Sequence, residues 1–142
     1  MQDKTEVLTS ILKTTQMGQV GIRAVINYAI RPELKKSLKS QLNEYDTIER
    51  DAQSIASSRG WEIKELDPVA KTMAKAYART RLSFDYNDSK IAQMMILGNT
   101  NGMIKTLVSQ HHAPKDDMKI KLLLQKLLDC ERANIRQMQE YV

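Results

Sequence analysis

Glu131 and Asn134 stand three positions apart in the strongly apolar run LLLQKLLDCERAN, which covers residues 122–134. Four-helix bundles that bind two metal ions carry a Glu-x-x-His motif in such a helix, because carboxylates bridge the metals and imidazole nitrogens complete the coordination. A full site also needs a second Glu-x-x-His motif and one Glu from each of the other two helices. The spacing therefore points to metal chemistry, while asparagine stands at the histidine position.

The other positions of such a site lack the required ligands. Glu44 is the one further carboxylate placed to act with Glu131, so a metal site would depend on these two residues. The two facing helices offer hydroxyls and amides, namely Thr15, Gln16, Asn99 and Asn101. The two histidines, His111 and His112, follow Asn99 by twelve or more positions. That separation is ~18 Å of helix, too far to complete the same site.

We interpret these residues instead as a polar layer inside a helical bundle. Its candidates are Glu131, Asn134, Asn101 and Tyr45. A buried polar residue in a helical seam can fix the register of the helices at some cost in stability. A lone buried carboxylate such as Glu131 must be neutral, paired or hydrogen-bonded, and we expect the other three residues to be its partners. Alternatively, the seam runs one position away and leaves Glu131 at its edge beside Arg132 or Arg136.

Five helices are predicted to position these side chains. Apolar residues recur at steps of three and four, which is typical of amphipathic helices, rather than at the steps of two that indicate strands. Glycine and proline separate the segments, and Pro68 suits the first turn of the third helix. The predicted helices cover residues 5–30, 33–58, 68–82, 88–110 and 115–141.

On the fourth and fifth helices, one stripe of residues is predicted to face the core. On the fourth helix the stripe connects Met94, Leu97, Asn101, Ile104 and Val108. On the fifth helix it connects Ile120, Leu124, Leu127, Glu131, Asn134, Met138 and Tyr141. We therefore expect Asn101 and Glu131 to meet across these two helices.

The order of the helices predicts an all-α protein with a ferritin-like four-helix bundle. Two helical hairpins, at residues 5–58 and 88–141, are joined by a crossover at residues 61–86 that contains the short connecting helix. A four-helix bundle with one long crossover is the ferritin-like arrangement. At 142 residues, the chain is expected to form a single domain over residues 1–142.

A faint internal repeat relates the first helices of the two hairpins. The segment TTQMGQV at residues 14–20 matches GNTNGMI at residues 98–104, so that Gly18 corresponds to Gly102. A glycine in mid-helix costs ~1 kcal/mol relative to alanine. We expect close approach of a neighbouring helix at both glycines to offset this cost.

Residues 31–61, RPELKKSLKSQLNEYDTIERDAQSIASSRGW, resemble the bacterial spore coat protein F family. The shared features are Pro32, Glu33, Leu34, Leu42, Glu44, Arg59, Gly60 and Trp61. Glu62 stands where that family usually has tyrosine, and the similarity is best over residues 5–66. Residues 90–107 also look like the matching helix of small bacterial ferritin-like proteins. The resemblance implies a ferritin-like bundle with a structural role in a spore coat or in cell protection.

The charge balance permits acidic partners without requiring them. The formal net charge is +5, and lysines and arginines are spread along the chain. The densest patches contain Lys35, Lys36, Lys39, Arg79 and Arg81. Nucleic-acid binders usually combine concentrated charge with several aromatic stacking residues, and only Phe84 lies within these patches. An anion-binding or nucleic-acid-binding module is therefore a further alternative, and nucleic acid is not the expected partner.

Composition indicates an intracellular protein, and the incomplete ligand set gives no cofactor to expect. The single cysteine, Cys130, excludes an intramolecular disulfide, and no signal peptide or apolar run near the ~20 residues of a membrane span is evident. We expect a cytoplasmic, non-enzymatic protein with no catalytic residues and a structural or protein-interaction role. Its expected partners are a second copy of the chain, as a dimer, or other proteins. The alternative is a metal-binding redox or storage protein built on Glu44 and Glu131.

Overall fold

The computed structural model describes residues 3–142, and this part of the chain is all-helical, as predicted. Five α-helices and one short 3-10 helix follow one another, with no strand among the described residues. They are α1 (Lys4–Val25), η1 (Ile26–Tyr28), α2 (Pro32–Ser58), α3 (Pro68–Leu82), α4 (Asp88–His112) and α5 (Met118–Gln139). None of these helices is both long enough and apolar enough to span a membrane.

Side-chain caps define where four of the helices begin. At the start of α1, Asp3 accepts a hydrogen bond from the Glu6 backbone N–H at 2.8 Å, and the Glu6 side chain accepts one from the Asp3 N–H. Asp67 caps α3, Asn87 caps α4 and Asp117 caps α5. Such caps satisfy backbone N–H groups that have no partner within the first helical turn.

The α1 helix ends at Val25, five residues before the predicted boundary. Ala29 adopts an extended conformation with ψ of 135°. The next two backbone N–H groups, of Ile30 and Arg31, donate to the Asp88 carboxylate at 2.8 and 3.0 Å. Because Asp88 is the first residue of α4, a contact distant in sequence stabilises the turn that follows the first helix.

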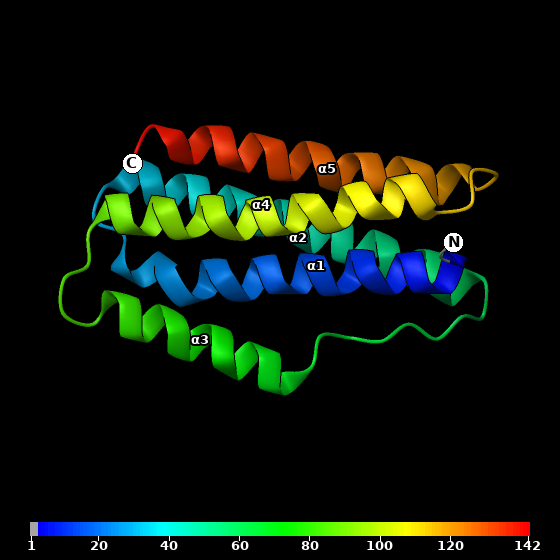
Figure 1. Ribbon diagram of the computed structural model, residues 1–142, viewed down its shortest axis with the longest axis horizontal. Helices are drawn as coiled ribbons and strands as arrows, with labels where there is room; N and C mark the ends of the chain where they lie inside the picture. Colours follow the sequence, from blue (N-terminus) through cyan, green and yellow to red (C-terminus); the bar gives the residue numbers. More distant parts are fainter. Residues whose placement is uncertain (1–2) are drawn as a thin grey trace.

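Four long helices lie side by side as a bundle, and α3 lies outside it against α1 (Figure 1). The α1 and α2 helices form one antiparallel hairpin, and α4 and α5 form the other. The hairpins meet where α1 packs on α4 and α2 packs on α5. An extended segment, residues 61–67, leads back along the bundle from the end of α2 to α3.

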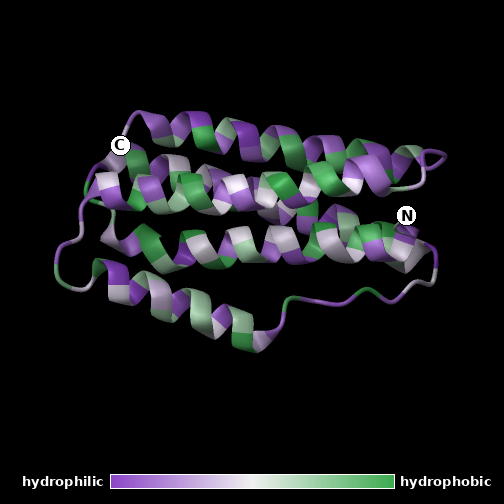
Figure 2. Cartoon of the chain, in the orientation of Figure 1, coloured by the Kyte–Doolittle hydropathy of each residue, from purple (hydrophilic) through white to green (hydrophobic). Residues whose placement is uncertain are grey.

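Aliphatic side chains from all five helices fill the interior. The largest fully buried ones are Leu8, Ile11, Leu12, Ile22, Leu34, Leu38, Ile48, Leu82, Ile91, Ile120, Leu127 and Met138. Each buried side chain of this size contributes about 1.5–3 kcal/mol. Figure 2 shows that hydrophobic and hydrophilic residues share every helix, as expected of amphipathic helices around a core.

The inward face of α4 differs from the predicted stripe. Leu97, Ile104 and Val108 are 57%, 53% and 45% exposed, and Asn101 is exposed as well. The buried face carries Ile91, Ala92, Met95, Asn99, Gly102, Thr106 and Ser109. The predicted stripe was wrong because α4 has two apolar faces, and the one that faces the core contains small and polar residues. Asn101 therefore does not meet Glu131 in the core.

The internal repeat extends over both hairpins. A shift of 84 positions, as from Gly18 to Gly102, relates the buried faces of α1 and α4. The matched buried pairs are Val7/Ile91, Leu8/Ala92, Ile11/Met95, Thr15/Asn99, Ile22/Thr106 and Val25/Ser109. A shift of 86 positions relates α2 to α5 in the same way. Its pairs are Leu34/Ile120, Leu38/Leu124, Gln41/Leu127, Tyr45/Glu131, Ile48/Asn134 and Ala52/Met138.

An ion pair joins the end of α2 to the start of α5. Arg59 donates to both carboxylate oxygens of the buried Asp117, and Lys4 Nζ lies 3.8 Å from the same carboxylate. The Arg59 guanidinium also lies 4.9 Å from the centre of the Trp61 ring. Gly60 has a φ of 67°, which lets the chain turn between these two residues. The hydrogen bonds from Arg59 hold the pKa of Asp117 below its ordinary value.

Candidate functional site

Three polar side chains from three helices meet in the core. The Tyr45 hydroxyl of α2 donates to Asn99 Oδ1 of α4 at 2.7 Å, and Asn134 Nδ2 of α5 donates to the same oxygen at 3.3 Å. Asn99 Nδ2 in turn donates to the Met95 carbonyl at 2.8 Å. All three polar side chains are buried. A buried polar group that loses its partner costs about 1–3 kcal/mol, so this network favours one register of α2, α4 and α5.

Glu131 lies in the same region of the core and is fully buried. Its Oε1 is 2.6 Å from Thr106 Oγ1, whereas its Oε2 has no hydrogen-bond partner among the described residues. Burial raises the pKa of Glu131 to about 7, although the hydrogen bond from Thr106 opposes this shift. The carboxyl group therefore exchanges its proton near neutral pH.

A protonated Glu131 suits the hydrogen bonds around Thr106. The Thr106 hydroxyl has one proton and two possible acceptors, Glu131 Oε1 at 2.6 Å and the Gly102 carbonyl at 3.0 Å. When Glu131 is protonated, it can donate to Thr106 Oγ1 while Thr106 donates to Gly102. When Glu131 is ionised, Thr106 can donate to only one acceptor at a time.

Tyr45, Asn99, Glu131 and Asn134 form the polar layer of the core, and two glycines make room for its side chains. A Cβ on Gly18 would lie 2.6 Å from carbon atoms of the Tyr45 ring, and a Cβ on Gly102 would overlap Glu131 Oε2. Tyr45 and Glu131 are equivalent in the internal repeat, so each hairpin pairs a mid-helix glycine with a side chain of its own second helix. The close approach expected at these glycines is between helix backbone and a side chain.

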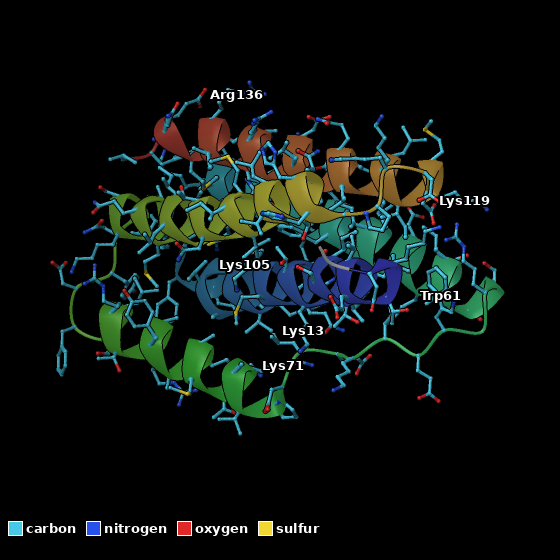
Figure 3. All side chains as sticks on the ribbon, turned by 45° about the vertical axis from the view of Figure 1, so that its right-hand side comes forward. Lys13, Trp61, Lys71, Lys105, Lys119 and Arg136 are labelled. Atoms are coloured by element: carbon cyan, nitrogen blue, oxygen red, sulfur yellow. The ribbon has the colours of Figure 1, made fainter. Side chains whose placement is uncertain are left out.

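A cavity of about 470 Å³ lies between α1, α3 and α4, above the polar layer. Tyr45, Asn99 and Glu131 reach its floor. Four of the five glycines in the chain line it, namely Gly18, Gly21, Gly98 and Gly102. Its remaining walls are largely apolar and include Met17, Val25, Tyr77, Met94 and Leu97. Figure 3 shows the three enclosing helices, with Lys13 labelled on α1, Lys71 on α3 and Lys105 on α4.

The structure brings together three of the four residues predicted for the polar layer. Tyr45 and Asn134 share Asn99 as a partner, and Glu131 lies one helical turn from Asn134. Asn101 is not part of the layer; it lies on the rim of the cavity instead.

Thr106, whose hydroxyl contacts Glu131, was not predicted from the sequence. The available signal was its spacing, because Thr106 follows Gly102 by one turn and Asn99 by two turns on a single helical face.

The two carboxylates of the alternative metal site lie in different environments. Glu44 is exposed on α2 and lines a surface hollow together with Cys130, whereas Glu131 is buried beside Thr106. His111 and His112 are exposed at the end of α4. Across residues 3–142, no three His, Cys, Asp or Glu side chains are grouped so that they could hold a metal ion. Glu44 and Glu131, which the sequence suggested as metal ligands, therefore do not form a metal site with other His, Cys, Asp or Glu side chains of residues 3–142.

Cys130 and the exposed basic residues are the remaining groups that could take part in chemistry. Burial raises the pKa of the Cys130 thiol above its ordinary value, and a hydrogen bond with Glu44 adds to the shift, so the thiol is protonated and a poor nucleophile. The basic residues lie exposed on separate helices. Lys35, Lys36 and Lys39 are on α2, and Arg79 and Arg81 are on α3.

Comparison of the chain with protein-family models, with curated proteins and with solved structures gave no match.

Proposed function

We propose that this protein is a ferritin-like helical bundle without a di-metal centre, and that its role is structural or in protein interaction rather than enzymatic. Two antiparallel hairpins joined by one long crossover support the ferritin-like assignment. The resemblance of residues 31–61 to spore coat protein F supports a structural role in the cytoplasm or in a spore coat.

The observation that carries this proposal is the composition of the polar layer. Ferritin-like metal sites use a Glu from each of two helices and Glu-x-x-His from each of the other two. In the internal repeat, the equivalent positions on α1 and α4 are Thr15 and Asn99. The equivalent i, i+3 pairs on α2 and α5 are Tyr45 with Ile48 and Glu131 with Asn134. One carboxylate and no imidazole remain, and Tyr45, Asn99 and Asn134 hydrogen-bond with one another.

A metal titration tests the first half of the proposal. The purified protein is incubated with iron(II) or manganese(II), desalted and submitted to elemental analysis. We expect no stoichiometric metal in the wild-type protein or in Glu131→Gln. Stoichiometric metal in the wild type that is lost in Glu131→Gln would support the redox or storage alternative and overturn the proposal.

The outer face of α4 supports a role in protein interaction, with a second copy of the chain as the partner. Leu97, Ile104 and Val108 are about half exposed and follow the spacing of a coiled-coil seam, with Asn101 at the intervening seam position. In an antiparallel pair of α4 helices, a two-fold axis near Asn101 would place this residue opposite Asn101 of the second chain. A two-fold interface pairs the same surface of both chains.

Light scattering on Ile104→Glu tests the second half of the proposal. We expect a dimer for the wild type and a monomer for the variant, because a charge in the centre of an apolar seam opposes pairing. Leu122→Glu is the matched control, since Leu122 is 62% exposed on α5 and lies outside the seam. A monomeric wild type, or a dimer that persists in Ile104→Glu, would contradict pairing through α4.

A further inference from the structure

We propose that the cavity between α1, α3 and α4 binds a small uncharged apolar molecule that carries a hydrogen-bond donor, and that this donor pairs with Glu131 Oε2. This inference goes beyond the structural role proposed above. The cavity lies within a single chain, but Leu97 and Asn101 belong both to its lining and to the proposed α4 seam, so the monomeric Ile104→Glu variant is titrated beside the wild type.

The unpartnered oxygen is the first observation that points to a ligand. Glu131 is fully buried and lines the cavity, yet its Oε2 accepts no hydrogen bond from the described residues. The oxygen is directed at Gly102, where any Cβ would overlap it. Leaving a buried acceptor unpaired is unfavourable, and a donor placed in the cavity would remove that cost.

The shape of the cavity is the second observation. Its volume of about 470 Å³ lies within the range of sites that hold small organic molecules. A Cβ added to Gly21 or Gly98 would meet no atom within 4 Å, so both glycines face open space. Gly18 and Gly102 leave room for the Tyr45 ring and the Glu131 carboxyl group at the inner end of the cavity. Bare helix backbone and apolar walls suit an apolar molecule rather than a hydrated ion.

The charges around the cavity favour an uncharged ligand. Lys105 lines the cavity and disfavours a cationic molecule there. Glu131 offers an unpaired acceptor oxygen and disfavours an anion. The Tyr45 hydroxyl already donates to Asn99 at 2.7 Å, so its proton is not available to the ligand. A neutral O–H or N–H group on an apolar body fits these conditions.

The cavity is open to solvent beside α3, since Leu97 and Tyr77, which line it, are 57% and 52% exposed. Only Ala78 and Leu82 of this helix are buried, and both lie in its C-terminal half. In its N-terminal half, Val69 and Met73 are 63% and 66% exposed. The cavity is therefore covered by a helix whose buried side chains lie in its C-terminal half, and the backbone N–H of Leu66, just before the helix, donates to Gln16 Oε1 of α1 at 2.7 Å.

Glycine amide resonances provide a direct test. The full chain, labelled with 15N, is titrated with 1-octanol, octane and octanoate, and the 1H–15N cross-peaks are followed. We expect 1-octanol to shift the cross-peaks of Gly18, Gly21, Gly98 and Gly102. Gly60 lies outside the cavity and serves as an internal control. One additional neutral hydrogen bond should make 1-octanol bind roughly three- to tenfold more tightly than octane.

Substitutions at the glycines and at Glu131 distinguish filling of the cavity from hydrogen bonding at its polar end. Gly98→Leu should fill the cavity and abolish binding of both 1-octanol and octane, whereas Gly98→Ala should retain binding. Gly21→Leu provides the same test from α1 if Gly98→Leu does not fold. Glu131→Leu should still bind octane but lose the preference for 1-octanol.

Several results would overturn the proposal. Unchanged glycine cross-peaks with every probe would exclude the site. Equal affinity of the wild type for 1-octanol and octane, or an unchanged preference in Glu131→Leu, would exclude pairing with Glu131. Tighter binding of octanoate than of 1-octanol would show that the cavity selects an anion through Lys105, and would rule out the uncharged ligand.

Discussion

Glu131 Oε2 occupies the space that a Cβ would need at Gly102. The glycine on α4 and the carboxyl group on α5 therefore depend on one another: only a residue without a side chain lets this carboxyl group lie where it does. The same relationship links Gly18 on α1 to Tyr45 on α2.

Gly102→Ala should lower the free energy of unfolding by about 1–2 kcal/mol. Overlap with a buried side chain typically costs about 1–3 kcal/mol, and the higher helix propensity of alanine returns up to about 1 kcal/mol. Urea denaturation monitored by circular dichroism measures the difference. Gly98→Ala is the matched control on the same helix and should raise stability by about 0.4–1 kcal/mol, because its Cβ meets no atom. Equal effects of the two substitutions would contradict the overlap.

Stability should decrease as the pH rises from about 4.5 to above 7. The folded protein keeps the Glu131 proton up to a pKa of about 7, whereas the ordinary pKa is 4.5, so the folded state binds more protons in this window. The free energy of unfolding therefore falls with increasing pH, by about 3 kcal/mol across the window if Glu131 acts alone. Urea titrations at several pH values measure this contribution.

Glu131→Gln isolates the contribution of the carboxyl group. The variant should match the wild type at pH 4.5 and exceed its stability at pH 8, because an amide carries no charge to bury. Tyr77 and Lys105, which also line the cavity, are common to both proteins. The pKa values of Tyr45 and Cys130 are raised chiefly by burial and further by the Glu131 charge, so both groups stay protonated up to pH 8 in either protein. A difference in stability that does not change with pH would show that Glu131 titrates normally.

Tyr45→Phe should destabilise the protein by about 1–2 kcal/mol. The substitution removes the donor of the 2.7 Å hydrogen bond to Asn99 and retains the ring that packs against Gly18. Thermal unfolding of the variant measures the loss. Tyr77→Phe is the control, since Tyr77 is 52% exposed, and it should have little effect.

Asp117→Ala should destabilise the protein by about 0.5–2 kcal/mol through loss of the α5 cap alone. The pKa of Asp117 is lowered, chiefly by the hydrogen bonds from Arg59, so its contribution is present above the ordinary pKa of 3.8 and is lost as the pH falls through the lowered value. This pH dependence is opposite in sign to that of Glu131. Asp116→Ala is the neighbouring control, because the Asp116 side chain is 75% exposed.

The sequence predicts helices well where the local signals are complete. The third helix was predicted at residues 68–82 and extends over Pro68–Leu82, because Asp67 and Pro68 together specify its first turn. The first helix was predicted five residues too long. The Asp88 carboxylate binds the backbone N–H groups of Ile30 and Arg31 in the turn after this helix, and it lies too far along the chain for a local pattern to reveal.

The register of α4 required knowledge of its neighbours. Leu97, Ile104 and Val108 form the more apolar stripe, yet the buried face has Gly102 and Thr106 at its centre. These small residues are buried because Glu131 lies against them. The sequence repeat identified Gly18 and Gly102 as related positions, but it could not identify which side chains approach them.

The internal repeat gives the two hairpins an approximate symmetry that the polar residues break. Position 45 holds a tyrosine whose hydroxyl is already bonded to Asn99, while the equivalent position 131 holds a carboxyl group with a free oxygen. A molecule in the cavity would therefore meet carbon on the side of Gly18 and oxygen on the side of Gly102. Because the two halves differ at these positions, the cavity is apolar on one side and polar on the other. It would therefore hold an asymmetric ligand in a single orientation.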